Sequence, residues 1–171
     1  MKLKTISEAD MADLIRRSIN GITGNPWIAT ESDVKCELYS NLYQLLHNRL
    51  DDLRTCGWRV ATEYNLFEDC WIDIAILRNE IPVFLLELKH LRNVSESYVR
   101  EAVMDFEKRK QYLQLNPNVY FVQVITSIYN GQHKALVESR LVPLYQEAGL
   151  QVQTLDRPAA TTFYIHVPSP K

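Results

Sequence analysis

Two apolar segments of this chain carry charged side chains in their middle, and they constrain its fold more than any other feature. Asp73 lies within the apolar run 71–77, and Glu87 and Lys89 lie within the run 83–89. Short segments that are apolar on both faces are typical of strands covered by helices on both sides. A charge in such a strand is costly unless a partner compensates it. The chain is therefore expected to place a charged site inside an α/β core.

Side-chain alternation divides the second segment into two faces. Glu87 and Lys89 fall on one face, and the apolar residues between them fall on the other. If the two segments form a hairpin whose loop is 78–82, the charges meet across the ladder. The resulting pairs are Leu77 with Val83, Ala75 with Leu85, and Asp73 with Glu87.

Two facing carboxylates destabilise a ladder, and a hard divalent cation bound to both would remove the conflict. Mg²⁺ typically uses one or two carboxylates together with water and substrate phosphate. Lys89 would extend from the same face and stabilise a developing hydroxide, or act as a base if burial lowers its pKa. The pattern favours metal-assisted phosphodiester hydrolysis. The alternative is a structural ion pair between Asp73 and Lys89.

The segments around these strands alternate between helical and strand patterns. Ser7 with Asp10, and Thr30 with Asp33, are spaced like capping boxes at two helix starts, and Gly21 is a predicted stop. The predicted helices are 7–20, 30–57, 95–115 and 132–148. The predicted strands are 58–64, 71–77, 83–89, 119–126, 150–155 and 161–167. The order of the first three strands predicts a meander.

Glu31 is a further candidate for the site. At 100° per residue it falls near the middle of the apolar stripe of the long helix, so its side chain could face the sheet. An acid in the first turn also favours the helix N-terminus electrostatically. Both interpretations stay open at this stage.

Composition bounds the function classes. The 171 residues fit one domain, and 19 Lys and Arg against 21 Asp and Glu give a formal charge of −2. This balance excludes a broadly basic, phosphate-neutralising protein. The three cysteines lack metal-ligand spacing and are typical of a reducing cytoplasm. The longest apolar stretches have strand length, so no membrane span is expected.

Taken together, the pattern resembles the PD-(D/E)XK nuclease superfamily. The resemblance covers about 31–126 and rests on Glu31, Asp73, and the Glu-x-Lys of Glu87 and Lys89, although Ile72 stands where the family name has proline. It implies a restriction-endonuclease-like α/β core, with a central mixed sheet flanked by helices on both faces. The expected organisation is a single domain over 1–171, with an N-terminal helix and loop at 1–29 and a C-terminal helix and strands at 132–171.

The resemblance also implies roles for individual residues. Asp73, Glu87 and the backbone carbonyl of Leu88 would bind Mg²⁺, for which Mn²⁺ could substitute. Lys89 would position or activate the attacking water, and Glu31 would support the metal through water. In several branches of the family the helix that corresponds to 95–115 adds a polar residue, and spacing does not decide which of Asp105, Lys108 and Gln111, if any, has that role here.

The implied activity is hydrolysis of nucleic acid, with DNA as the expected substrate. A small domain has limited surface for a duplex, so a homodimer or a larger complex is expected if both strands are cut. The alternative is a non-catalytic nuclease-fold module that acts through a protein or nucleic-acid partner. An enzyme for a small anionic substrate is a third interpretation, which the lack of a glycine-rich phosphate loop disfavours.

Overall fold

The computed structural model describes residues 6–22, 30–49, 56–91, 96–116, 118–127, 153–156 and 161–165, with residues 139, 143 and 147. Its helices are α1 (Glu8–Ile22), α2 (Glu31–Arg49) and α3 (Glu96–Leu115). Its strands are β1 (Trp58–Phe67), β2 (Cys70–Arg78), β3 (Ile81–Leu91), β4 (Tyr120–Ser127), β5 (Gln153–Asp156) and β6 (Thr161–Ile165).

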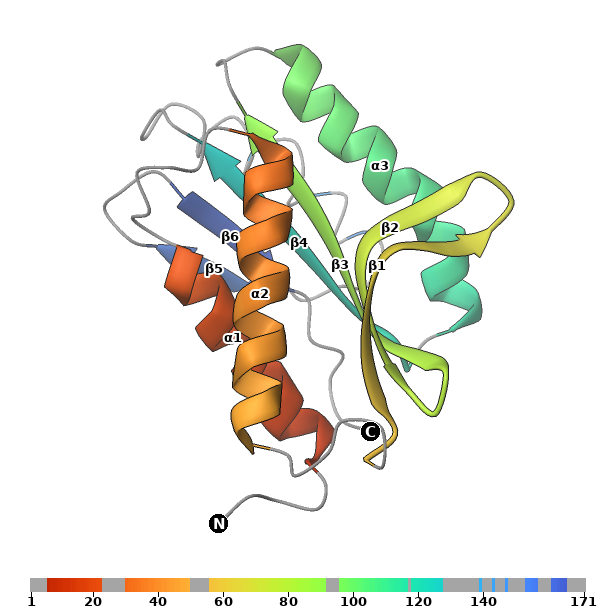
Figure 1. The fold of residues 1–171 in the computed structure, drawn as a ribbon. Helices are drawn as coiled ribbons and strands as arrows, with labels where there is room; N and C mark the ends of the chain where they lie inside the picture. The colour runs from red at the N-terminus through yellow and green to blue at the C-terminus, as the bar shows by residue number, and fades with distance from the viewer. Residues whose placement is uncertain are drawn as a thin grey trace.

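The strands form one mixed sheet in the order β1-β2-β3-β4-β6-β5. β1, β2 and β3 are antiparallel neighbours, which confirms the predicted meander. β3 and β4 are parallel, and α3 provides the crossover between them. The helices α1 and α2 lie on one side of the sheet and α3 on the other (Figure 1). The predicted α/β class and mixed sheet are therefore confirmed.

The main core lies between the sheet and the pair α1 and α2. One set of alternating strand positions faces this core, and its members include Ile74, Ile76, Phe84, Leu86, Leu88, Val122 and Val124. The intervening positions face α3, where Phe106 packs against Phe121 with ring centroids 5.9 Å apart. β3 is thus covered on both faces, as its apolar pattern predicts.

Both predicted capping boxes are present. Thr30 Oγ1 accepts a hydrogen bond from the Asp33 N–H (3.1 Å), and the Asp33 carboxylate accepts one from the Thr30 N–H (2.7 Å). Ser7 and Asp10 make the same pair of contacts at the start of α1. These contacts satisfy N–H groups that a helix start leaves without partners. The box at Thr30 fixes where α2 begins, and hence the position of Glu31.

The hairpin between β2 and β3 corrects the predicted register near its turn. Leu77 pairs with Pro82, whereas the sequence predicts Val83. The reason is the turn: Asn79 and Glu80 both have positive φ, 51° and 65°, as a two-residue type I′ connection requires. This tight turn shifts the first pairs by one residue. A register shift between Ile76 and Leu77 then restores the predicted pairing of Ala75 with Leu85.

Other predicted boundaries differ slightly or fall outside the described residues. Gly21, the predicted stop, lies inside α1, which continues to Ile22. α2 ends at Arg49; of the rest of its predicted length, 50–55 lies outside the described residues, and 56–57 form a turn and not a helix. The predicted helix 132–148 also lies outside them, apart from three single residues. Over the described part of the chain, no helix is long and apolar enough to cross a membrane.

The capping box of α2 yields a stability prediction. Thr30→Ala removes the side-chain acceptor for the Asp33 N–H, so we expect the free energy of unfolding to fall by about 1 kcal/mol. Ser32→Ala, at an exposed position in the same helical turn, should change it by less than about 0.5 kcal/mol. Urea unfolding of both variants measures the difference. Equal losses in the two variants would show that the cap does not stabilise α2.

Candidate functional site

The candidate site lies where β2 parts from β3. The paired residues of the two strands end at Ile74 and Leu86, one step before Asp73 would face Glu87. Asp73 Oδ2 instead accepts a hydrogen bond from the Leu88 N–H, at 2.8 Å. The predicted register is therefore present up to Ile74 and Leu86. Beyond that pair, Asp73 and Glu87 lie on strands that are no longer paired.

Glu87 is the most deeply buried acid of the site. Its side chain is 6% exposed, and its Oε1 lies 2.9 Å from a guanidinium nitrogen of Arg109 on α3. Arg109 also donates to the backbone carbonyls of Trp71 (2.5 Å) and Asp105 (2.6 Å). The second Glu87 oxygen, Oε2, is buried without a hydrogen-bond partner. When Glu87 is ionised this oxygen is an acceptor available to a cation, and a bound cation would favour the ionised form.

Asp73 is paired with a lysine from the other side of the sheet. Lys35 of α2 places its Nζ 3.0 Å from Asp73 Oδ1, and it also contacts Glu63 of β1. The alternative interpretation, an ion pair of Asp73 with Lys89, is therefore replaced by an ion pair of Asp73 with Lys35. Asp73 now has one oxygen on an ammonium group and the other on a backbone N–H.

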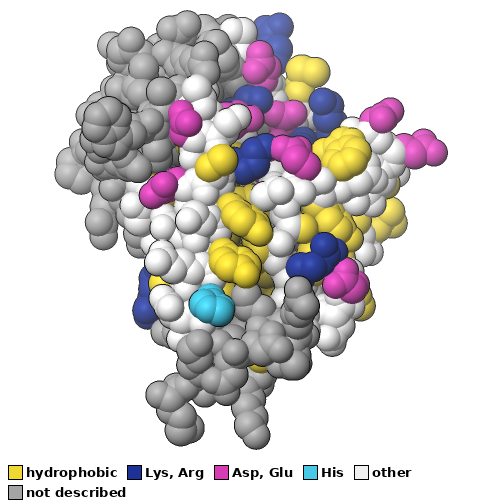
Figure 2. Space-filling view, in the orientation of Figure 1, with side chains coloured by type: hydrophobic (Ala, Val, Ile, Leu, Met, Phe, Trp, Pro, Cys, Tyr) yellow, Lys and Arg dark blue, Asp and Glu magenta, His cyan; other side chains and the backbone are white. Residues whose placement is uncertain are grey.

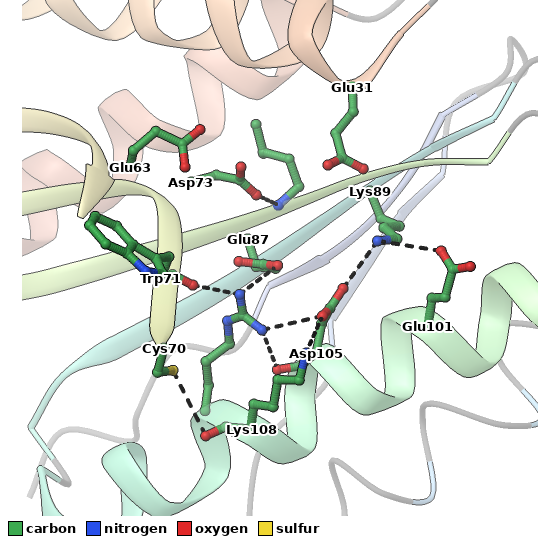
Figure 3. Close-up of polar contacts among 12 residues, drawn as sticks. Glu31, Glu63, Cys70, Trp71, Asp73, Glu87, Lys89, Glu101, Asp105 and Lys108 are labelled. Atoms are coloured by element: carbon green, nitrogen blue, oxygen red, sulfur yellow. Dashed lines mark hydrogen bonds and ion pairs between the residues drawn. The ribbon is translucent and has the colours of Figure 1, made fainter. Parts of the chain in front are cut away.

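Lys89 projects toward α3 (Figure 3). Its Nζ lies 3.1 Å from Asp105 and 3.7 Å from Glu101. Burial lowers the pKa of Lys89, but Asp105, Glu31 and Glu101 raise it by more, so the net pKa is above its ordinary value. Lys89 is thus an ammonium at neutral pH. This corrects the part of the hypothesis in which a lowered pKa would make it a base.

Glu31 reaches the sheet, which is one of the two interpretations that the sequence leaves open. Its Oε2 accepts a hydrogen bond from the His90 N–H, at 3.2 Å. Burial raises the pKa of Glu31, Lys89 lowers it, and Asp73 raises it again. Glu31 is therefore electrostatically coupled to the predicted acid of β2 and the predicted lysine of β3.

The three accessory candidates on α3 differ in their burial and in their contacts with the site. Asp105 contacts Lys89, and its carboxylate also lies 3.5 Å from Arg109. Lys108 is largely exposed and comes within 3.8 Å of Asp105. Gln111 is exposed. Of the three, Asp105 is the one whose charge joins the network around Glu87 and Lys89.

Sequence reasoning missed the two cations that pair with the predicted acids. Lys35 follows Glu31 by one helical turn, and Arg109 follows Asp105 by one turn. Residues four apart lie on the same helix face, so this spacing was the available signal. On α3 the same spacing also fits a solvated face of alternating charges, and that interpretation concealed Arg109. Glu63 gave no signal, because its position depends on the conformation of β1.

The donor set can be compared with the metal that the sequence predicts. In the described residues, no group of three His, Cys, Asp or Glu side chains is arranged to hold a metal ion. Mg²⁺ can be bound by one or two carboxylates with water, however, and Asp73 and Glu87 are hard oxygen donors. The buried, unpartnered Glu87 Oε2 fits such an ion. The contact found for Leu88 involves its N–H, and its carbonyl remains a predicted ligand.

The burial of Glu87 predicts how stability depends on pH. Burial raises the pKa of Glu87 from 4.5 to about 9, against a lowering by Arg109. Between these values the folded chain holds a proton that the unfolded chain releases, so stability falls as pH rises. We expect thermal unfolding in a chelator to show this loss between pH 6 and about 9. Glu87→Gln should reduce it, whereas Glu80→Gln, at an exposed turn, should not. Parallel pH profiles for all three proteins would contradict the assignment.

No protein-family model, curated protein or solved structure matches this chain. Functional inference therefore depends on the geometry of Asp73, Glu87 and Lys89 and of the residues that contact them. The contacts join five elements, α2, β1, β2, β3 and α3, at the point where β2 and β3 separate.

Proposed function

We propose that this chain is a Mg²⁺-dependent nuclease with a restriction-endonuclease-like fold that hydrolyses DNA phosphodiester bonds. The observation that carries the proposal is the pair of carboxylates at the parting of β2 and β3. Asp73 and Glu87 converge there, and the buried Glu87 Oε2 lacks a partner. Two acids and a lysine on adjacent strands, backed by a glutamate from a preceding helix, support the resemblance found in the sequence.

In this proposal Asp73 and Glu87 hold the divalent ion, and the Leu88 carbonyl completes the protein ligands. The bound ion would supply Lewis acidity and a water of lowered pKa. Lys89 remains an ammonium and orients the attacking water by hydrogen bonding, while Asp105 and Glu101 hold its Nζ in place. Glu31 accepts from the His90 N–H and so fixes the start of α2 against the end of β3.

DNA would have to be bound by charges close to the site, and not by the protein surface as a whole. Among the described residues on the face shown in Figure 2, acidic and basic side chains are interspersed and do not form one continuous basic surface. Affinity for DNA would therefore come mainly from the ion at the site and from a few nearby cations. Cutting both strands of a duplex would be served by a symmetric homodimer, with one site for each strand.

The proposal is tested by metal-dependent cleavage. Supercoiled plasmid, linear duplex, single-stranded DNA and RNA are incubated with Mg²⁺ or Mn²⁺ and the purified protein. We expect Lys89→Ala to lower the cleavage rate by at least about 100-fold, because the water loses its orienting ammonium. Lys110→Ala, on the same helix as Asp105 but paired with Glu107, should cleave like wild type.

Two results would contradict the proposal. One is undiminished cleavage by a folded Lys89→Ala variant, which would remove the role of Lys89. The other is the absence of cleavage by well-folded wild-type protein on every substrate with either metal. Thermal unfolding of each protein shows that the comparison concerns folded chains.

A second candidate function is a non-catalytic nuclease-fold module that acts through a macromolecular partner. The specific observation in its favour is that both acids already have internal cations, Lys35 on Asp73 and Arg109 on Glu87. Such a protein would gain no thermal stability from Mn²⁺ and would cleave nothing. A nuclease would gain stability from Mn²⁺, because an ion that binds only the folded state stabilises it.

A further inference from the structure

We infer that Lys35 is an internal cation that a divalent ion must displace from Asp73, and that Glu63 receives the displaced ammonium group. The inference rests on the proposed function in one respect: it takes Asp73 as a ligand of that ion. It adds two residues, Lys35 and Glu63, that no part of the sequence resemblance includes. Their role is to position and balance charge at the metal site.

The two oxygens of Asp73 are in different states. Oδ2 accepts from the Leu88 N–H at 2.8 Å, and this bond joins β2 to β3 where their ladder has ended. Oδ1 lies 3.0 Å from Lys35 Nζ. Each carboxylate oxygen has two lone pairs, but an ion that avoids competing with the strand contact approaches Oδ1, the oxygen that Lys35 already contacts. Two cations on one carboxylate oxygen repel each other strongly in a partly buried site.

Glu63 offers Lys35 a second partner that is already in contact. The Lys35 ammonium binds both Glu63 and Asp73, so it can leave Asp73 while keeping a charge partner. Glu63 is also the more solvated of the two acids, with its side chain 60% exposed against 13% for Asp73. Movement of Lys35 toward Glu63 is thus movement toward solvent, away from the buried carboxylates.

The backbone of Glu63 is unusual for a strand. Its φ is 50°, in the left-handed region that favours glycine, although it lies inside β1. The pairs on either side of it, Thr62 with Ile74 and Tyr64 with Ile72, are regular, and the pair of Glu63 with Asp73 is missing between them. A costly conformation of this kind persists where its surroundings require it. Here it accompanies the contact of Glu63 with Lys35, next to the predicted metal ligand.

The inference is tested by measuring the Mn²⁺ dissociation constant with titration calorimetry, without substrate. Lys35→Met removes the competing charge and should tighten binding about tenfold, equivalent to about 1.4 kcal/mol. Glu63→Gln removes the receiving carboxylate and should weaken binding several-fold. Glu80→Gln is the matched control, because Glu80 is also a glutamate with positive φ but lies in the β2–β3 turn. It should bind like wild type.

The double variant Lys35→Met with Glu63→Gln separates the mechanism from simple electrostatics. If Glu63 acts by receiving Lys35, its removal has no effect once Lys35 is absent, and the double variant binds like Lys35→Met alone. If the weakening persists without Lys35, Glu63 acts on the ion directly and the inference is overturned. Weaker binding by Lys35→Met itself also overturns it.

Thermal unfolding of each variant confirms folding, and Lys35→Gln replaces Lys35→Met if the latter does not fold. Failure of the inference and failure of the proposed function give different results. When wild type binds Mn²⁺ but the variants do not follow the expected order, only the roles of Lys35 and Glu63 are refuted. When neither wild type nor Lys35→Met binds Mn²⁺, the metal site itself is refuted, and this inference with it.

Discussion

The buried pair of Glu87 and Arg109 is the interaction on which the rest of the site depends. The Glu87 side chain is only 6% exposed in a strand covered on both faces, and Arg109, 2.9 Å away, lowers the cost of ionising it. The same guanidinium donates to the carbonyls of Trp71 on β2 and Asp105 on α3. One side chain thus joins β2, β3 and α3. Arg109 also lies 3.5 Å from the Asp105 carboxylate, and Asp105 in turn contacts Lys89. Both predicted charges of β3, Glu87 and Lys89, are thus linked to Arg109.

Separation of β2 and β3 sets the geometry of these buried acids. A continuous ladder would have placed Asp73 and Glu87 directly opposite each other inside the sheet, where two like charges destabilise the pair. Ending the ladder at Ile74 and Leu86 lets Asp73 turn to a backbone N–H and to a lysine from α2. The conflict that the sequence predicts is therefore relieved by geometry as well as by cations. Of the carboxylate oxygens of Asp73 and Glu87, Glu87 Oε2 is the one without a hydrogen-bond partner.

The features predicted correctly from the sequence are those with local causes. The capping boxes and the meander follow from short-range spacing. Helical periodicity gave the inward position of Glu31 only as one of two open interpretations, and the tertiary contact with the His90 N–H decides between them. The register near the β2–β3 turn could not be predicted, because it depends on Asn79 and Glu80 both adopting positive φ. The partners of the acids were equally inaccessible. Lys35 and Arg109 are on helices that only the tertiary fold brings to opposite faces of the same two strands.

Charge balance links the site to the composition of the whole chain. A slight overall excess of acid excludes a broadly basic surface, and so counts against binding DNA by phosphate neutralisation alone. Within the described residues around the site, the carboxylates of Glu31, Glu63, Asp73, Glu87, Glu101 and Asp105 face the cations Lys35, Lys89, Lys108 and Arg109. Such a surplus of negative charge attracts a divalent cation. In the proposed nuclease, the metal would bring the polyanion to an acidic protein, and internal cations such as Lys35 balance the charge of the acids while the metal is absent.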